Sequence, residues 1–220
     1  MRDLNQLLFK FDKKKNFNNH DFYVSESNKH ILDLFNKWPK WEKNFLNIFG
    51  EKFSGKTHLI NIFLKRYGGL KIEASKLDNN ILDQIKIHQN IILENLCLDI
   101  DENLLYSLIN MVDQDNKYLI ITSNTSIVEI NFNLLDLNSR TKNFLLFSLK
   151  DPDDELVFAL ILKNLSDRQI SVDEKLINYI IKRIDRSYRK IYDFIYKIDE
   201  ISLKKKKSVD FKIIREVLGD

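Results

Sequence analysis

Three kinds of residue are scarce in this chain of 220 residues, which has one cysteine, two prolines and five glycines. The single cysteine, Cys97, excludes a disulfide framework and a cysteine-based zinc site, and it fits a reducing compartment. The low proline and glycine content indicates long regular elements with few tight turns. We therefore expect a core-forming globular chain rather than a small scaffold held together by covalent links.

Long apolar runs and an excess of one charge are also missing. No apolar run approaches the length of a membrane span, and the first residues lack the apolar segment of a signal peptide. We therefore expect a cytoplasmic protein without a membrane partner. The net charge of +3 is too small to require nucleic acid. The basic runs Lys13–Lys15 and Lys204–Lys207 fit solvated loops, with a surface for an anionic partner as the alternative.

What the chain does contain is the pattern G-x-x-x-x-G-K-T between Gly50 and Thr57. This pattern is typical of a P-loop, in which glycines let the backbone wrap around an anion and point its N–H groups at phosphate oxygens. Lys56 would reach the β and γ phosphates, and the Thr57 hydroxyl would bind Mg²⁺. The predicted nucleotide contacts in this stretch are Gly50, Ser54, Gly55, Lys56, Thr57 and His58.

The context of the motif agrees with this prediction. The short apolar run Phe45–Phe49 before it suits a buried parallel strand, and residues 58–66 after it have the pattern of a helix. The glycines at 68 and 69 should end that helix. One residue departs from the pattern, since Phe53 stands where many P-loops carry another glycine. If the loop requires a positive φ there, Phe53 is strained and the loop is remodelled.

Strands and helices alternate from Asn44 to about residue 150, which predicts a parallel sheet with helices on both faces. Beyond Asp151-Pro152 only helical periodicity remains. We predict an α/β fold of the AAA+ P-loop type, with a five-stranded parallel sheet flanked by helices and a small all-α lid. The predicted divisions are a flexible tail (1–20), a nucleotide-binding domain (21–150) and a helical lid (151–220). The expected strands are Phe45–Phe49, Leu70–Ala74, Ile91–Leu93, Tyr118–Thr122 and Phe144–Leu149.

Helices are expected between these strands and throughout the lid. The clearest one inside the sheet region is Asn103–Val112, and Ser27–Lys37 should form a helix with Ser27 near its N-cap. The helices expected in the lid are Asp154–Leu165, Asp173–Ile184, Ser187–Leu203 and Asp210–Leu218.

Polar residues follow two of the expected strands. A P-loop enzyme needs an acid at a strand end to hold Mg²⁺ and usually a second acid to orient water. Glu94 can serve the metal through water, together with Thr57, but Asn95 occupies the second position, and an amide cannot act as a base. The alternative is a core strand that ends in a surface glutamate. Asn124 could touch the γ phosphate, or simply belong to a strand-end turn.

Two arginines are candidates for contact with phosphate. Arg140 precedes the last expected strand and could project from the edge of the module to a neighbour's nucleotide, as an arginine finger does. For Arg140 taken in isolation, a surface salt bridge is the favoured explanation. Arg186 begins a lid helix and could reach back to the phosphates, or pair with Asp185 or another nearby acid.

The segment Gln6-Leu7-Leu8-Phe9-Lys10-Phe11 is an apolar island in an otherwise polar and basic tail. Apolar side chains in a flexible tail reduce solubility unless something buries them. A short docking peptide for a partner protein would explain them, and an N-terminal strand folded onto the core is the alternative.

Taken together, these stretches resemble the DnaA/Hda family of bacterial AAA+ proteins over about residues 20–218. Further stretches carry the resemblance, namely Phe22–Asn28, Trp38–Trp41, Gly55–Leu59, Leu104–Asn110, Asp136–Arg140, Asp151–Asp154, Ser166–Ile170 and Arg183–Ser187. Within the family the chain is similar to the Hda type, because it ends after the lid and leaves no room for the initiator's DNA-binding domain. The island at Gln6 is similar to the Q-L-x-L-x-L peptide that docks on the DNA polymerase sliding clamp, with Phe9 and Phe11 in place of leucines.

The resemblance implies a regulator of chromosomal replication initiation. Such a protein binds ADP or ATP with Mg²⁺, docks on the sliding clamp through Gln6, Leu7, Phe9 and Phe11, and reaches DNA only through the clamp. It promotes hydrolysis of ATP bound to DnaA, and it can form a homodimer. Arg140 would be the finger acting in trans. Ser123 or Asn124 would correspond to sensor 1, and Arg186 to sensor 2.

Two alternatives stay open at this point. A DnaA-like adaptor would act without the clamp, and an autonomous P-loop ATPase would hydrolyse its own nucleotide. The apolar island favours the clamp-dependent regulator over the adaptor. Asn95 and Phe53 disfavour the autonomous enzyme, so we predict weak or absent hydrolysis by the chain itself.

Overall fold

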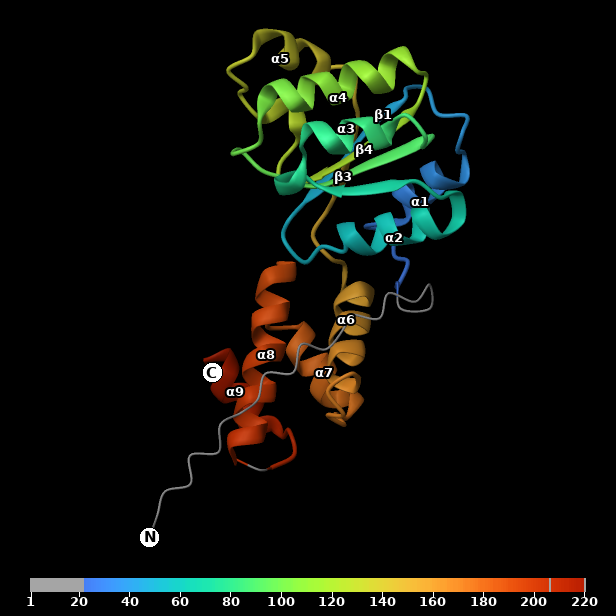
Figure 1. The fold of residues 1–220 in the computed structure, drawn as a ribbon. Coiled ribbons are helices and arrows are strands. Elements are labelled where there is room, and N and C mark those ends of the chain that lie inside the picture. Colours follow the sequence, from blue (N-terminus) through green and yellow to red (C-terminus); the bar gives the residue numbers. More distant parts are fainter. Residues whose placement is uncertain (1–21, 206, 220) are drawn as a thin grey trace.

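The computed structural model describes residues 22–205 and 207–219, and the predicted tail with its docking peptide lies outside them. A five-stranded parallel sheet carries helices on both faces, and a group of helices follows it (Figure 1). This confirms the predicted α/β class and the five parallel strands. The strands are β1 (Phe45–Gly50), β2 (Leu70–Glu73), β3 (Asn90–Leu96), β4 (Tyr118–Ser123) and β5 (Leu145–Leu149).

The strand order β2-β3-β4-β1-β5 places β1 inside the sheet. The chain leaves β1 for the far edge at β2, steps back through β3 and β4, and then crosses β1 to reach β5. In register, Leu46 of β1 lies beside Ile120 of β4 and Leu145 of β5. Because every strand is parallel, all carboxyl ends meet at one edge of the sheet, where α/β folds bind ligands. The P-loop follows β1 at this edge.

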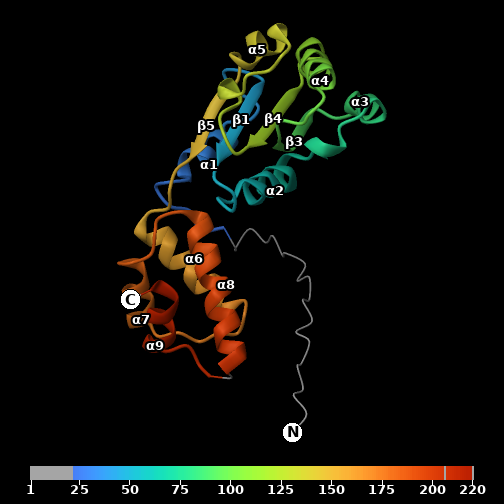
Figure 2. The same ribbon diagram turned by 90° about the vertical axis from the view of Figure 1, so that its left-hand side faces the viewer.

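Two layers of helices cover the sheet (Figures 1 and 2). On one face lie α1 (Lys29–Asn36) and α2 (Lys56–Tyr67), and on the other lie α3 (Asn79–Ile85), α4 (Glu102–Gln114) and α5 (Leu135–Thr141). Each face has its own buried apolar cluster, because alternate strand residues point to opposite faces. Burial of apolar area on both faces explains why the strands read as continuous apolar runs.

Some boundaries differ from the sequence prediction. The first helix begins at Lys29, and its N-cap residue is Asn28 rather than Ser27. The physical reason is a turn closed by Asn28, whose side chain accepts from the Ser25 amide and donates to the Tyr23 carbonyl. The strand expected to end at Ala74 ends at Glu73, since Ala74–Lys76 forms a short 3₁₀ helix, η2. The helix after the P-loop begins at Lys56, two residues earlier than expected.

A buried asparagine ties the centre of the sheet to the loop after β4. Asn47 of β1 is fully buried, and its side-chain amide donates to the Ile121 carbonyl at 3.1 Å and the Ser123 hydroxyl at 2.9 Å. Its carbonyl oxygen accepts from the Ile127 amide at 2.9 Å. Buried polar groups are tolerated only when they are hydrogen-bonded, and here the amide is satisfied on both sides. Asn47 therefore fixes the path of the chain beyond β4.

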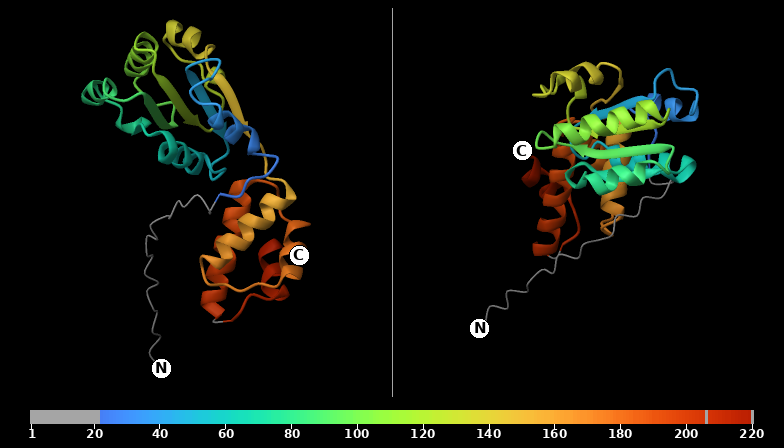
Figure 3. Two further views of the ribbon diagram at one scale, coloured as in Figure 1. Left: turned by 90° about the vertical axis from the view of Figure 1, so that its right-hand side faces the viewer. Right: turned by 45° about the horizontal axis from the view of Figure 1, so that its top comes forward.

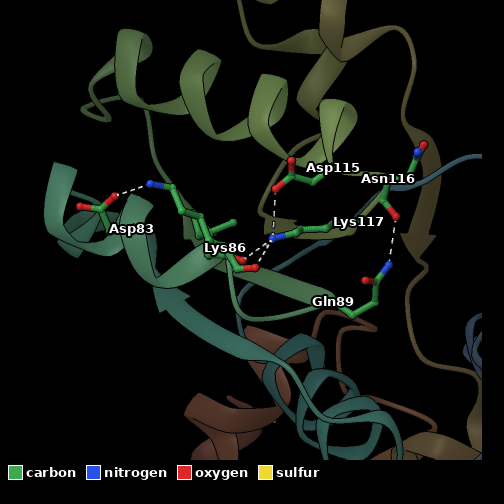
Figure 4. Close-up of polar contacts among 7 residues, drawn as sticks. Asp83, Lys86, Gln89, Asp115, Asn116 and Lys117 are labelled. Atoms are coloured by element: carbon green, nitrogen blue, oxygen red, sulfur yellow. Dashed lines mark hydrogen bonds and ion pairs between the residues drawn. The ribbon is translucent and has the colours of Figure 1, made fainter.

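A buried lysine has a similar structural role on the α3 side (Figure 4). The Lys117 ammonium donates to the carbonyl oxygens of Ile85 and Lys86, both at 2.8 Å, and lies 3.2 Å from an Asp115 carboxylate oxygen. These carbonyls belong to the end of α3, where backbone acceptors lack helical partners and the helix dipole is negative. Lys117 thus caps α3 and joins it to the start of β4.

Four helices follow β5 in the described part of the chain and pack on one another (Figure 3). Each of three begins with an aspartate whose carboxylate accepts a backbone N–H, namely Asp153, Asp173 and Asp210. The division of the chain near residue 150 stays a prediction, although β5 ends at Leu149 and only helices come after it. The helices are α6 (Asp154–Ser166), α7 (Glu174–Ile181), α8 (Tyr188–Lys205) and α9 (Phe211–Leu218).

Among residues 22–205 and 207–219, no helix is both long enough and apolar enough to cross a membrane.

Replacing Asn47 by leucine should destabilise the protein, because leucine has a similar size but leaves the buried Ile127 amide without its acceptor. We expect the free energy of unfolding to fall by about 1–3 kcal/mol, measured by urea denaturation followed by circular dichroism. Asn80→Ala, at an exposed position of α3, is the matched control and should stay within about 0.5 kcal/mol of the natural protein. Equal stability of Asn47→Leu and the natural protein would contradict the structural role of Asn47.

Candidate functional site

The P-loop begins where β1 passes very close to β5. A Cβ atom on Gly50 would lie 2.9 Å from the Leu149 carbonyl oxygen, so only glycine fits there without a shift of the backbone. Gly55 precedes α2 and has a φ of 95°, a left-handed conformation that glycine adopts without strain. These two glycines turn the chain from β1 into α2. The first N–H groups and the positive dipole end of α2 therefore face the carboxyl edge of the sheet.

Lys56 is buried at the start of α2 and bonded to the P-loop backbone. Its ammonium donates to the carbonyl oxygens of Gly50 at 2.7 Å and Glu51 at 2.9 Å. Burial lowers the pKa of Lys56 from 10.5 to about 8, and the Glu51 carboxylate opposes this only in part. A cation whose charge is disfavoured by burial gains from an anion placed beside it, so Lys56 suits a phosphate group.

Phe53 has a positive φ, the conformation in which the sequence analysis expected it to be strained. Its φ is 72°, and a left-handed conformation costs a non-glycine residue about 1–2 kcal/mol. The Phe53 ring stacks on Tyr192 of α8, with ring centroids 4.3 Å apart and the planes 8° from parallel. The Phe53 side chain therefore packs against the helices that follow the sheet, and remodelling of the loop stays a prediction.

A cleft of about 540 Å³ opens beside the P-loop, between the sheet and the helices that follow it. The P-loop side is polar and carries Ser54, Gly55, Lys56 and Thr57. The opposite side is largely apolar and aromatic, with contributions from the segment before α1 and from α6 and α8. The residues on that side include Phe22, Tyr23, Leu156, Ala159, Leu160, Tyr188 and Tyr192. This pairing of anion-binding N–H groups with flat apolar walls can hold a phosphate chain and an aromatic base.

His58 connects the P-loop side of this cleft to the segment before α1. It lies in the first turn of α2, and its ring stacks on Phe22, with centroids 5.2 Å apart. The structure thus brings every predicted P-loop contact from Ser54 to His58 to one cleft. Gly50 is not among the cleft residues in the described part of the chain, and its carbonyl oxygen accepts from the Lys56 ammonium.

Glu94 is buried at the end of β3, with one carboxylate oxygen 2.8 Å from the Lys71 ammonium. Its other oxygen, Oε1, is buried and has no hydrogen-bond partner within residues 22–205 and 207–219. A buried carboxylate oxygen without a donor fits a water molecule bound to Mg²⁺. Thr57 lines the cleft at the start of α2, whereas Glu94 is not among the lining residues in the part of the chain that the structure describes. The described residues contain no group of three or more His, Cys, Asp or Glu that could hold a metal directly.

Asn95 and Asn124 both reach the cleft from neighbouring strand ends. The Asn95 side chain donates to a Glu73 carboxylate oxygen at 2.8 Å, and its backbone N–H donates to the Thr122 hydroxyl at 2.9 Å. The sequence left open whether Ser123 or Asn124 faces the nucleotide. Ser123 is buried and bonded to Asn47, whereas Asn124 is exposed in the cleft. Asn124 is thus the one placed to contact a ligand.

The two candidate arginines lie outside the cleft, as far as the described residues define it. Arg186 forms an ion pair with Asp154 at the start of α6, which is the pairing with a nearby acid that the sequence allowed. Arg140 lies in α5, and its guanidinium is 2.9 Å from an Asp113 carboxylate oxygen. α5 lies at the edge of the sheet away from the P-loop (Figures 1 and 2). Arg140 is in the last turn of α5 and Asp113 is in the last turn of α4, and these helices lead into β5 and β4, so Arg140 stands at the amino edge of the sheet. Arg140 therefore cannot reach the cleft of its own chain.

Sequence reasoning missed the residues that connect the P-loop to α8. The Ser187 hydroxyl donates to the Glu51 carboxylate at 2.7 Å, and Tyr192 stacks on Phe53. Glu51 and Phe53 were visible as P-loop positions, but nothing local in the sequence pairs them with residues far along the chain. A weak signal was the aromatic character of Phe53, which needs a partner when it replaces glycine.

The chain has relatives of two kinds, and no protein-family model matches it. An uncharacterized protein of Haemophilus influenzae is 24% identical over 211 residues, which cover 90% of this chain and 91% of that protein. The chromosomal replication initiator protein DnaA of Caldanaerobacter subterraneus subsp. tengcongensis is 24% identical over 225 residues, which cover 90% of this chain. The same match covers 51% of DnaA, so the chain spans about half the length of the curated DnaA relatives it matches.

Solved structures show the same architecture. Domain III of the Thermotoga maritima initiator DnaA superimposes with a TM-score of 0.72 and 21% identity over 93% of this chain and 96% of that one. AMPPCP-bound DnaA from Aquifex aeolicus gives a TM-score of 0.64 with 18% identity, covering 87% and 71% of the two chains. The Thermotoga maritima RuvB Holliday junction branch migration motor gives 0.63 with 13% identity, covering 87% and 68%.

These likenesses show the class of the fold, which is like that of AAA+ modules. The initiator domains among them make the description more particular, and the fold is that of a DnaA-like AAA+ domain.

The affinity of the cleft for ADP should fall as the pH rises above about 8. A bound phosphate raises the pKa of Lys56 above its free value of about 8, so binding is strongest below that pH, where the ammonium is already charged. We expect about five- to tenfold weaker binding at pH 9 than at pH 7, measured by isothermal titration calorimetry. Lys56→Met should bind weakly at both pH values. If its affinity still fell with pH, the titrating group would not be Lys56.

Proposed function

We propose that this chain binds an adenine nucleotide and regulates the initiation of chromosomal replication by promoting hydrolysis of ATP bound to DnaA. The observation that carries the proposal is the position of Arg140 on a DnaA-like fold. Arg140 is partly exposed at the amino edge of the sheet, and the P-loop of its own chain lies at the opposite edge. An arginine in this position can stabilise transition-state charge only in a neighbouring molecule's site.

The nucleotide side of the proposal rests on the cleft. Several structural neighbours are DnaA proteins, and two of their structures contain bound AMPPCP. In this chain the P-loop N–H groups and Lys56 would hold the phosphates, and Asn124 would face the γ position. Thr57 and Glu94 would hold Mg²⁺, the latter through water, and the ion would offset phosphate charge. The role of Arg186 at the phosphates stays a prediction, because Arg186 would first have to leave Asp154.

Hydrolysis of the chain's own nucleotide is not part of the proposed function. The position after Glu94 is Asn95, whose amide is already committed to Glu73 and has no basic character. Without a carboxylate to orient water, bound nucleotide would act as a structural component. The proposed chemistry therefore belongs to the partner's ATP, and Arg140 supplies the group that this chain adds to it.

Delivery to the replication machinery is assigned to the N-terminal tail, which lies outside the described residues. Gln6, Leu7, Phe9 and Phe11 would dock on the DNA polymerase sliding clamp, which brings the chain to DNA indirectly. The proposal of an Hda-type regulator, rather than a DnaA-like adaptor that works without the clamp, depends on this peptide.

Arg140→Ala should abolish stimulation of DnaA ATP hydrolysis while leaving nucleotide binding intact. Arginine fingers contribute about 10³- to 10⁵-fold in rate, so we expect the stimulated rate to fall at least about a hundredfold. The measurement is single-turnover hydrolysis of radiolabelled ATP on DnaA in the presence of this chain, clamp and DNA. Arg215→Ala, an exposed arginine on α9, is the charge-matched control and should stimulate normally.

Equal stimulation by Arg140→Ala and the natural protein would refute the finger. Steady hydrolysis by this chain alone, lost on Lys56→Ala, would instead favour the autonomous ATPase.

The paired change Gln6→Ala and Leu7→Ala should remove retention on immobilised sliding clamp, because a docking peptide loses both its polar anchor and an apolar anchor. Lys13→Ala with Lys14→Ala is the control for a general effect of changing the tail, and it should be retained as the natural protein is. Retention of the Gln6 and Leu7 variant on the clamp would contradict the proposal that this segment is the docking peptide. Full stimulation of DnaA without any clamp would favour the adaptor instead.

A further inference from the structure

We propose that four residues form a clasp that holds the P-loop against the lid helix α8 and slows release of the bound nucleotide. The four are Glu51 and Phe53 from the P-loop and Ser187 and Tyr192 from the start of α8, and we call them the P-loop clasp. The inference rests on the proposed nucleotide binding in the cleft, and it assigns positioning residues to that site.

The clasp consists of two separate contacts between the same two elements. Ser187 donates to Glu51 at 2.7 Å, and the Arg189 backbone N–H approaches the other Glu51 oxygen at 3.5 Å. One turn further along α8, the Tyr192 ring stacks on Phe53 with centroids 4.3 Å apart. A carboxylate at the first N–H groups of a helix is favoured by the helix dipole. The P-loop is therefore fixed to α8 by an electrostatic and an aromatic contact at once.

The backbone of Phe53 indicates that the aromatic contact has a function beyond filling space. Phe53 has a φ of 72°, a conformation that glycine adopts freely and phenylalanine does not. The side chain is 37% exposed, so burial in the core does not explain why a strained aromatic residue stands there. Backbone strain of this kind persists where surrounding contacts hold it, and it concentrates at ligand clamps. The contact that holds Phe53 is the Tyr192 ring, with the Lys52 ammonium 5.3 Å from the Phe53 centroid.

The clasp lies on the walls of the cleft. Phe53 and Tyr192 both line it, on the P-loop side and the α8 side respectively, next to Ser54 and Lys56. Widening the cleft by moving α8 away from the P-loop would have to separate Phe53 from Tyr192 and Ser187 from Glu51. Release of a nucleotide through the widened cleft therefore requires breaking both contacts, and the clasp should act mainly on the dissociation rate.

The test is the dissociation rate of a fluorescent N-methylanthraniloyl-ADP, chased with excess ADP in a stopped-flow instrument on the full chain. Removal of the ring pair by Phe53→Gly or by Tyr192→Ala should speed release about three- to tenfold, which is the size of one aromatic contact. Tyr192→Phe keeps the ring and should restore slow release. Tyr196→Ala, one turn further along α8 and exposed, is the matched control and should release at the natural rate.

If Phe53 and Tyr192 served only to stabilise the fold, faster release would come with a lower thermal unfolding midpoint. The clasp predicts a different result for Phe53→Gly. Because glycine relieves the strained backbone, the midpoint should be equal to or above that of the natural protein while release becomes faster. The double variant should be no faster than either single one, because both remove the same contact. Natural release rates in both Phe53→Gly and Tyr192→Ala would overturn the clasp while leaving nucleotide binding standing. Failure of the natural chain to bind the fluorescent ADP would overturn the nucleotide site itself.

Discussion

The close approach of β5 to the end of β1 is the constraint on which the site depends. With the Leu149 carbonyl oxygen so near Gly50, the chain must leave the sheet at this point and turn towards α2. The turn carries Gly55 and Lys56 to the carboxyl edge, where β3 and β4 also end and bring Asn95 and Asn124. Asn47 fixes the same strand from the other side by binding the loop after β4. One crowded strand end thus sets the position of the P-loop at the cleft.

Glu51 couples the electrostatics of the P-loop to the helices beyond the sheet. Its carboxylate raises the pKa of Lys56 against the larger effect of burial, and it accepts the Ser187 hydroxyl at the start of α8. Any change in the position of α8 would therefore alter the electrostatic environment of the phosphate-binding lysine. Glu94 is also a buried carboxylate. One of its oxygens pairs with Lys71, and the other has no donor within residues 22–205 and 207–219. In the proposed nucleotide site, Lys56 would balance phosphate charge, and the position after Glu94 carries the amide of Asn95 instead of a second carboxylate.

Much of the fold could be predicted because its signals are local. The apolar runs at Phe45–Phe49 and Tyr118–Thr122 are confirmed as strands of a parallel sheet, and the P-loop stands between a strand and a helix. The start of the first helix could not be placed from the Ser27 side chain, since the turn that Asn28 closes depends on the Tyr23 carbonyl. The strain at Phe53 was foreseeable from its place in the motif. Its Tyr192 partner was not, because only the folded arrangement brings the two rings together.

The separation of the two edges of the sheet gives the proposed function its physical logic. The groups that would hold this chain's nucleotide lie at the carboxyl edge, and Arg140 lies at the amino edge, paired with Asp113 on the solvent side. An exposed ion pair of this kind is worth little, so Arg140 can leave Asp113 for a phosphate at small cost. If the clasp keeps the chain's own nucleotide in place, the cleft stays in one state while a partner's ATP is hydrolysed at the opposite edge. Such a regulator would keep its own nucleotide bound while the partner's ATP is hydrolysed, and the separation of the two edges of the sheet allows this.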